Sequence, residues 1–229
     1  MHVVLLGDSV FDNRPYVRPG EPDVVEQVRE RLPEGSQATL LARDGDVTSD
    51  VAAQLGALPR DATHVFLSVG GNDVLGHAGM LRESASSVAQ AVRLLAAVGE
   101  SFEASYRSVL DIVLARGLPT GISTIYYPRF DMEETARHAD LGMAETEQQA
   151  RQDFQRLACT ALSVFNDVII RGAFERGLPL LDLRLICSEE SDYANPIEPS
   201  AAGGAKIAGA LVEALLSHDF SSGRTQVFT

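Results

Sequence analysis

The sequence predicts a single α/β domain built on a parallel sheet that helices cover on both faces. Five short apolar runs alternate with helical periodicities along the 229 residues, which is typical of parallel strands joined by crossover helices. Polar, glycine-rich turns follow the first three runs, at the strand ends where such sheets bind ligands. The length suits one domain. We assign residues 1–216 to this domain and residues 217–229 to a loose C-terminal tail.

The predicted strands are short runs rich in β-branched residues and leucine, each bounded by glycine, proline or polar residues. They cover residues 2–6, 38–42, 65–69, 121–127 and 178–183. The predicted helices carry apolar residues three or four positions apart, and they lie around residues 23–32, 51–58, 102–114, 154–165 and 207–215. Residues 128–143 have the weakest hydrophobic periodicity. This segment is interpreted either as a lid over the edge of the sheet or as a solvated connection without a role.

The charge balance argues against several classes of partner. The chain has 19 Lys and Arg against 32 Asp and Glu, a formal net charge of −13. Such a surface repels phosphate backbones and anionic lipids, so we expect neither a nucleic acid nor a membrane as partner. Two cysteines, Cys159 and Cys187, are too few for a disulfide framework or a four-ligand zinc site. With no signal-peptide pattern and no apolar stretch of roughly 20 residues, the sequence predicts a cytoplasmic protein.

Polar clusters follow the first three predicted strands. They are Gly7-Asp8-Ser9, Gly45-Asp46 and Gly70-Gly71-Asn72-Asp73. The carboxyl ends of parallel strands lie at one edge of a sheet, so we expect these three loops to share one rim. Each cluster alone is only a turn sequence, and their convergence carries the prediction.

Several familiar motifs are missing from the sequence. It has no G-x-S-x-G elbow, no G-x-G-x-x-G, no G-x-x-x-x-G-K-[ST] and no H-E-x-x-H, which argues against the usual α/β-hydrolase, dinucleotide, phosphate-loop and zinc-protease sites. A metal site would use Asp8, Asp12 and Asp73, but their spacing fixes no coordination geometry. A metal site at these residues is a minor alternative.

Ser9 has the chemistry of a nucleophile at the end of a strand. A serine hydroxyl needs a base to accept its proton, and an acyl-transfer intermediate needs hydrogen-bond donors for its oxyanion. The backbone N–H groups of Ser9 and Gly45 and the amide of Asn72 are three such donors. Taken singly, Ser9 reads equally as a turn or capping serine and Asn72 as a turn former. Together they favour an acyl-transfer site.

These blocks resemble those of the SGNH hydrolases, also called the GDSL esterase/lipase family. The matching residues are Gly7-Asp8-Ser9-Val10, Gly45 within residues 44–50, and Gly70-Gly71-Asn72-Asp73. The resemblance implies a flavodoxin-like three-layer α/β/α sandwich with a five-stranded parallel sheet, and hydrolysis of small ester or acyl substrates without a cofactor. It also implies a nucleophile at Ser9 and an oxyanion hole from Ser9, Gly45 and Asn72. Asp8, Gly71, Asp73 and His77 are expected to contact the substrate.

The fourth block departs from the family pattern. The family carries D-x-x-H-P before the last helix, whereas this chain has Asn195-Pro196-Ile197-Glu198-Pro199. Glu198 therefore occupies the position of the histidine base and Asn195 that of the aspartate that orients it. An ordinary glutamate titrates near ~4.3, so Glu198 is an effective base only if burial raises its pKa. Asn195 avoids a second charge and offers an amide to hold the Glu198 carboxylate.

Two functions from different classes follow. In the first, the protein is a serine hydrolase with Ser9 as nucleophile and Glu198 as an unusual base. In the second, it is a catalytically impaired domain that binds an acyl or glycosyl ligand in the same cleft. Another histidine is a third possibility for the base: His77 lies five residues beyond Asn72, and His138 lies in the segment that could form a lid. The sequence leaves the oligomeric state open.

Overall fold

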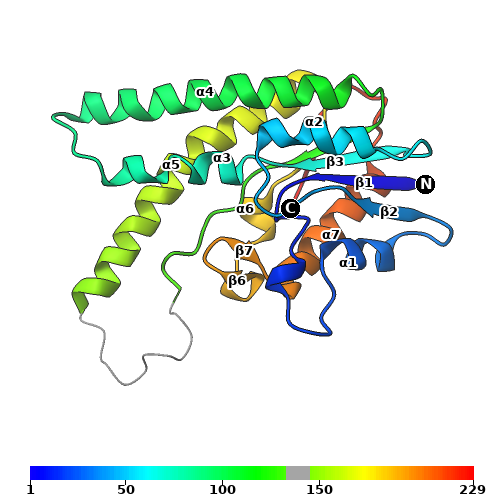
Figure 1. Ribbon diagram of the computed structural model, residues 1–229, viewed down its shortest axis with the longest axis horizontal. Coiled ribbons are helices and arrows are strands. Elements are labelled where there is room, and N and C mark those ends of the chain that lie inside the picture. The colour runs from blue at the N-terminus through cyan, green and yellow to red at the C-terminus, as the bar shows by residue number, and fades with distance from the viewer. Residues whose placement is uncertain (133–144) are drawn as a thin grey trace.

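A parallel sheet of six strands forms the centre of the protein in the computed structural model, which describes residues 1–132 and 145–229 (Figure 1). The strands lie in the order β2-β1-β3-β4-β5-β8 and all adjacent pairs are parallel. Their bounds are β1 His2–Gly7, β2 Gln37–Leu40, β3 His64–Ser68, β4 Thr120–Ser123, β5 Leu180–Leu181 and β8 Val227–Phe228. The five predicted strands are all present, although β4 and β5 are shorter than expected.

The sixth strand corrects two expectations, the five-stranded sheet and the loose tail. Residues Val227 and Phe228 form β8 and pair with Leu180 and Leu181 of β5. Phe228 is only 3% exposed and belongs to the hydrophobic core. A strand of two residues has no measurable periodicity, so the sequence pattern gave no signal for it. The C-terminus is thereby tied to the edge of the sheet.

Helices cover both faces of the sheet, and each face has its own core. Along β1, Val3 and Leu5 pack in one core while Val4 and Leu6 pack in the other, because successive strand residues point to opposite faces. The first core lies under α1 (Val24–Arg31), α6 (Leu183–Ile186) and α7 (Ala201–Ser217), and the second under α2 (Val51–Gln54), α4 (Val88–Leu114) and α5 (Glu145–Arg176). This is the predicted three-layer sandwich.

Gly7 and Gly70 allow the loops after β1 and β3 to approach their neighbours closely. Gly7 has φ +125°, and a Cβ at this position would lie 1.7 Å from the carbonyl oxygen of Ser68. Gly70 has φ +123°, and its Cβ would lie 2.9 Å from the ring of Phe102. Both positions exclude a side chain on steric and conformational grounds. The two turns therefore bring the ends of β1 and β3 against each other.

Helix α5 meets a length-and-composition criterion for membrane spans, contrary to the expectation that no stretch does. Half of the apolar window in its residues 148–176 is nevertheless buried within the molecule. The helix packs along α4, where the ring centroids of Phe102 and Phe165 are 5.4 Å apart in an edge-to-face arrangement. This is the behaviour of a core helix. Most of the predicted lid or connection, residues 128–143, lies outside the described residues, and so does His138.

Candidate active site

Hydrogen bonds join the loops that follow β1, β2 and β3. The side chain of Gln54, at the end of α2, accepts a hydrogen bond from the Gly7 N–H (2.8 Å) and donates to the Gly7 carbonyl (2.7 Å) and to Asp46 Oδ2 (2.8 Å). Asn72, in α3 (Gly71–Leu75), donates from Nδ2 to the Asp46 carbonyl at 2.9 Å. The three loops therefore share one rim, as the sequence predicts.

Ser9 lies in the tight turn after β1. The Asp8 N–H donates to the Ser68 carbonyl at 3.1 Å, and Asp8 Oδ1 accepts from the Val10 N–H at 3.2 Å. These bonds fix the backbone on both sides of Ser9. Ser9 is 6% exposed, and it lines a cavity together with Asp8, Asn72 and Glu198.

Glu198 is presented by a small antiparallel pair, β6 (Tyr193–Asn195) and β7 (Glu198–Pro199). The turn between the two strands is held from the end of β4: the Tyr126 hydroxyl donates to the Ile197 carbonyl at 2.5 Å, and the Arg129 N–H donates to the Pro196 carbonyl at 2.7 Å. The backbone thus fixes where the Glu198 side chain begins.

Asn195 shapes this turn and does not hold the Glu198 carboxylate. Its Oδ1 accepts a hydrogen bond from the Ile197 N–H at 3.0 Å, a local contact between a side chain and the backbone two residues on. In the described part of the chain, no hydrogen bond joins Asn195 to the carboxylate of Glu198. The expectation that Asn195 orients Glu198 is therefore not met, because the short turn uses the amide oxygen itself.

Burial makes Glu198 a stronger base than an ordinary glutamate. The residue is 7% exposed, and its pKa is raised to about 7. Burial is the main cause of the raised pKa; the polar Ser9 side chain lowers the pKa, and the negative charge of Asp44 raises it. Among the described residues, Oε2 of Glu198 has no hydrogen-bond partner. Near neutral pH this carboxylate can therefore accept a proton.

Asp8 is a second buried carboxyl group in the cavity. Its pKa is raised to about 7, first by burial and then by the negative charges of Glu198 and Asp73, while the Val10 N–H opposes the shift. Two carboxyl groups that interact in this way titrate as a pair. Ionisation of Glu198 therefore disfavours ionisation of Asp8.

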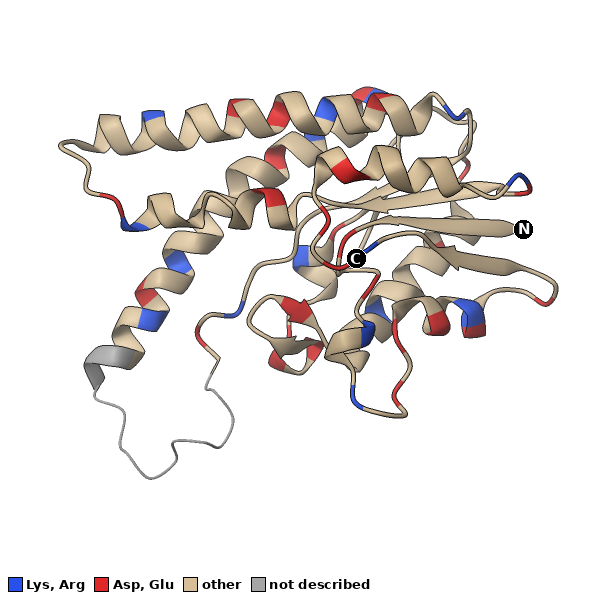
Figure 2. Ribbon diagram, viewed as in Figure 1, with Lys and Arg blue, Asp and Glu red and all other residues tan. Residues whose placement is uncertain are grey.

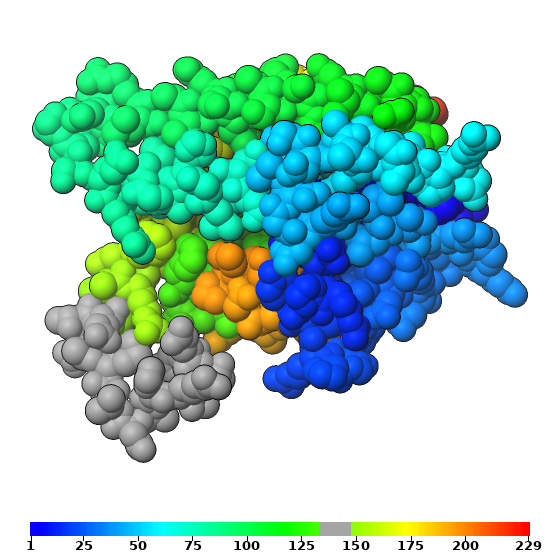
Figure 3. Space-filling view, in the orientation of Figure 1, coloured from blue at the N-terminus to red at the C-terminus, as the bar shows by residue number. Residues whose placement is uncertain are grey.

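The cavity beside Ser9 is apolar beyond its polar end and encloses about 110 Å³. Its apolar wall comes from α3, from the 3₁₀ helix Ala78–Arg82, from α5 and from the chain after β4. The wall includes Val74, Leu75, Met80, Leu81, Ile125, Phe130, Phe154, Ala158, Ala161, Leu162 and Phe165. Figure 3 shows the segment that contains β7, in orange, between the blue amino-terminal loops and the teal and green segments that build this wall. An acyl chain fits such a surface.

A model of the GDSL-like lipase/acylhydrolase family matches residues 5–206. The chain belongs to this family. It is a hydrolase, and members of the family act on small ester or acyl substrates. No match was found among curated proteins.

Solved structures of GDSL-type and related hydrolases share this fold. An extracellular lipase from Streptomyces rimosus is 19% identical, with a TM-score of 0.62 over 93% of this chain and 99% of the lipase. A phospholipase A1 from Streptomyces albidoflavus NA297 is 19% identical, with a TM-score of 0.59 over 93% and 98%. The esterase EstA from a Pseudoalteromonas species is 12% identical, with a TM-score of 0.60 over 93% and 96%.

The other residues predicted from the GDSL-like pattern fall into two groups. Gly71 and His77 line the cavity with Ser9, whereas Gly45 and Asp73 do not. Asp73 turns away from the cavity and accepts hydrogen bonds from the Thr48 N–H (3.0 Å) and hydroxyl (2.6 Å). Gly45 is exposed, with φ +85°, in the loop beside the cavity. Asp73 thus stabilises this rim of the GDSL-like site rather than lining the substrate cavity.

Two features of this GDSL-like site were missed in the sequence. Tyr126 lies within a predicted strand, yet its hydroxyl supports the turn before Glu198 and its ring lines the cavity. Ala158 and Ala161 lie in the helix predicted around residues 154–165 from its apolar periodicity, and in the structure they line the cavity from α5. A pair of alanines among the large apolar residues of α5 is the only sequence signal for that space.

Proposed function

We propose that this protein hydrolyses carboxylic esters, with Ser9 as the nucleophile and Glu198 as the general base. One observation carries the proposal: Ser9 lines the same cavity as Glu198, a buried carboxyl group whose pKa is raised to about 7. A base with a pKa near the working pH combines a useful deprotonated fraction with useful basicity. The neutral amide at position 195 leaves Glu198 without the aspartate partner of the family pattern.

The reaction proceeds in two acyl-transfer steps. Ser9 Oγ attacks the ester carbonyl while Glu198 takes the hydroxyl proton, and the protonated Glu198 then gives that proton to the departing alkoxide. Glu198 next takes a proton from a water molecule, which attacks the acyl-enzyme, and returns it to Ser9 as the carboxylic acid leaves. The steps need no metal or cofactor.

Backbone and amide N–H groups stabilise the oxyanion in this proposal. They are the Ser9 N–H and the side-chain amide of Asn72, two residues that line the cavity; Gly45, the third donor expected from the sequence, does not line it. Asn72 Nδ2 carries two hydrogens, and its bond to the Asp46 carbonyl uses one of them. The second hydrogen is free to bond the oxyanion of the substrate, while the bond to the Asp46 carbonyl holds the amide in place.

A second candidate function is a binding domain that has lost hydrolytic power. It is favoured by the absence of a hydrogen bond that orients Glu198, since Oε2 has no partner among the described residues. Such a domain would hold an acyl ligand in the same cavity. The two functions differ only in whether Ser9 is activated.

Labelling and hydrolysis assays separate the two. Wild type, Ser9→Ala and Glu198→Gln are treated with a fluorophosphonate probe and assayed on a panel of small activated esters. Glu190→Gln is the matched control, because Glu190 is an exposed glutamate just before β6. We expect labelling to require Ser9, and Glu198→Gln to lower kcat by about 10³-fold or more while Glu190→Gln has no effect.

Three results would contradict this mechanism in different ways. An unlabelled wild type that is as inactive as Ser9→Ala leaves the binding domain as the function. Activity that requires Ser9 but survives Glu198→Gln places the base elsewhere, and His77, which lines the cavity, is then the first residue to replace. Equal loss in Glu190→Gln and Glu198→Gln would mean that the substitutions act through folding.

A further inference from the structure

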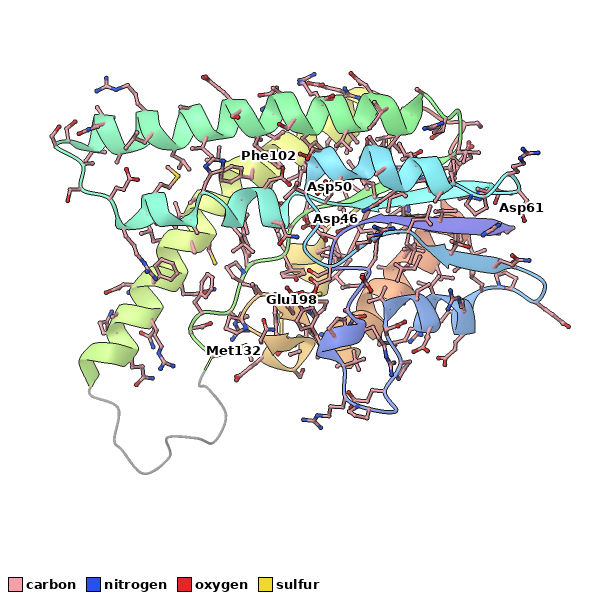
Figure 4. All side chains as sticks on the ribbon, viewed as in Figure 1. Asp46, Asp50, Asp61, Phe102, Met132 and Glu198 are labelled. Carbon is pink, nitrogen blue, oxygen red and sulfur yellow. The ribbon has the colours of Figure 1, made fainter. Side chains whose placement is uncertain are left out.

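Carboxylates are concentrated in the loops that build the polar edge of the site. The loops after β1, β2 and β3 carry Asp12, Asp44, Asp46, Asp50 and Asp73, next to Asp8 and Glu198 in the site itself. Figure 2 shows red segments where these loops meet, at the carboxyl edge of the sheet. Figure 4 shows Glu198 and Asp46 at this edge, and Asp61 at the opposite one. The substrate therefore meets a strongly negative rim.

Within the described residues, no ion pair involves the carboxylates of this rim. Elsewhere acids form ion pairs with bases, such as Glu103 with Arg171 (3.1 Å) and Asp192 with Lys206 (2.8 Å). The carboxylates of the rim instead accept hydrogen bonds from neutral groups, as Asp44 does from the Tyr16 hydroxyl at 2.9 Å. Arg43 lies in the loop after β2, but its side chain is exposed and in no described ion pair.

Glu198 supplies a second, independent observation. The residue is more than nine-tenths buried and lines the cavity, yet its Oε2 has no hydrogen-bond partner among the described residues. The negative charge of Asp44 acts on Glu198, and those of Glu198 and Asp73 act on Asp8. An ionised carboxylate that is buried without a partner costs free energy, which a cationic ligand would recover.

The two sides of Ser9 suit two different parts of an ester. In the proposed reaction the apolar cavity takes the acyl chain, which leaves the alcohol part of the ester to the acidic loops beside Ser9. We propose that the substrate is an ester whose alcohol part carries a positive charge, such as a quaternary ammonium group. This inference rests on the proposed esterase function. The cation would lie between Glu198 and the loop that contains Asp44, where the negative potential concentrates it.

Two esters of the same shape test the charge preference. Butyrylcholine carries a quaternary nitrogen where 3,3-dimethylbutyl butyrate has a neutral carbon. At low salt we expect kcat/KM to be about tenfold or more higher for the choline ester, as one or two partly screened carboxylate contacts would give. The ratio should shrink as salt is added. A ratio of one or below would overturn the proposal.

Single substitutions locate the source of the preference. Asp44→Asn should lower the ratio of the two kcat/KM values severalfold, because it removes the acidic group whose charge acts on Glu198. Asp61→Asn is the matched control, since Asp61 is an exposed acid at the opposite edge of the sheet. It should leave the ratio unchanged. A preference that survives Asp44→Asn unaltered would overturn the role of these loops.

Binding to an inactive variant separates this inference from the esterase function. If neither ester is hydrolysed, the proposed function fails, and the two esters are then titrated into Ser9→Ala by NMR. A lower Kd for butyrylcholine than for 3,3-dimethylbutyl butyrate supports the charge preference without any catalysis. Equal Kd values, or no detectable binding of butyrylcholine, would overturn it.

Discussion

The two walls of the site are built in different ways. The polar wall comes from loops that directly follow β1, β2 and β3, and specific hydrogen bonds through Gln54 and Asn72 hold it together. The apolar wall comes from α3, from the chain after β4 and from α5. Burial holds its side chains, and Asn166 and Gln155 of α5 form hydrogen bonds with the backbone after β4. Hydrogen-bonded loops fail when one donor or acceptor is lost, whereas an apolar wall tolerates changes that conserve volume. Mutations in the polar wall should therefore be detected as a loss of stability, and mutations in the apolar wall as a change in substrate specificity.

The largest expected effect on stability is at Gln54. Gln54→Ala leaves the buried Gly7 N–H without its partner, while the Gly7 carbonyl keeps the Arg43 N–H at 3.1 Å. We expect the free energy of unfolding to fall by about 1–3 kcal/mol. Gln152→Ala, at an exposed position of α5, is the control and should change stability little. Urea unfolding of both variants measures this. A loss below ~0.5 kcal/mol for Gln54→Ala would show that the polar wall does not depend on this side chain.

Filling the apolar wall should change specificity rather than stability. In Ala161→Phe the added ring enters the cavity of about 110 Å³. We expect kcat/KM for an octanoyl ester to fall by a factor of about 30, because about 2 kcal/mol of free energy from burial of the acyl chain is lost. The acetyl ester should be hydrolysed almost as before. Leu157→Phe, on the exposed side of the same helix, is the matched control. Equal losses on both esters would mean that the acyl chain lies elsewhere.

A smaller effect is expected on the pH dependence of stability. The pKa of Glu198 is raised in the folded protein, so folding favours the neutral carboxyl group. Its contribution to stability is present below the unfolded pKa and is lost as the pH rises through about 7. Glu198→Gln stays neutral and should exceed the wild type in stability by about 1–2 kcal/mol at pH ~8.5, but not at pH ~4. Thermal melts at both pH values measure this, and an equal difference at both would contradict the pKa shift.

The sequence predicted the polar wall better than the apolar wall. Ser9 and Asn72 carry recognisable chemistry directly after strands, so the parallel sheet alone brings them to one rim. Glu198 was found from its place before α7. Asp73 and Asn195 do not have the contacts expected of them. Asp73 accepts a hydrogen bond from Thr48 in the loop after β2, and Asn195 accepts one from the backbone two residues on. Residue type alone reveals neither contact. Ala158 and Ala161 have no chemistry to mark them.

The strands also differ in how well the sequence predicts them. Strands that are continuous apolar runs, such as β1 and β3, were predicted within a residue or two, because both of their faces are buried. Strand β8 was missed, since its two residues are fixed by pairing with β5 and by burial of Phe228 rather than by any local pattern. The cytoplasmic location and the absence of nucleic-acid and membrane partners stay predictions.

The pH dependence of kcat/KM tests most directly whether Glu198 is the base. The assay uses wild type and Glu198→Gln on a neutral activated ester, where the charge of the substrate does not interfere. Because the base must be ionised, the rate of the wild type should rise with pH and level off above a midpoint near the Glu198 pKa of about 7. The residual rate of Glu198→Gln should lack this rise. A flat wild-type profile between pH ~5.5 and ~8.5, or the same rise in both proteins, would contradict a glutamate base.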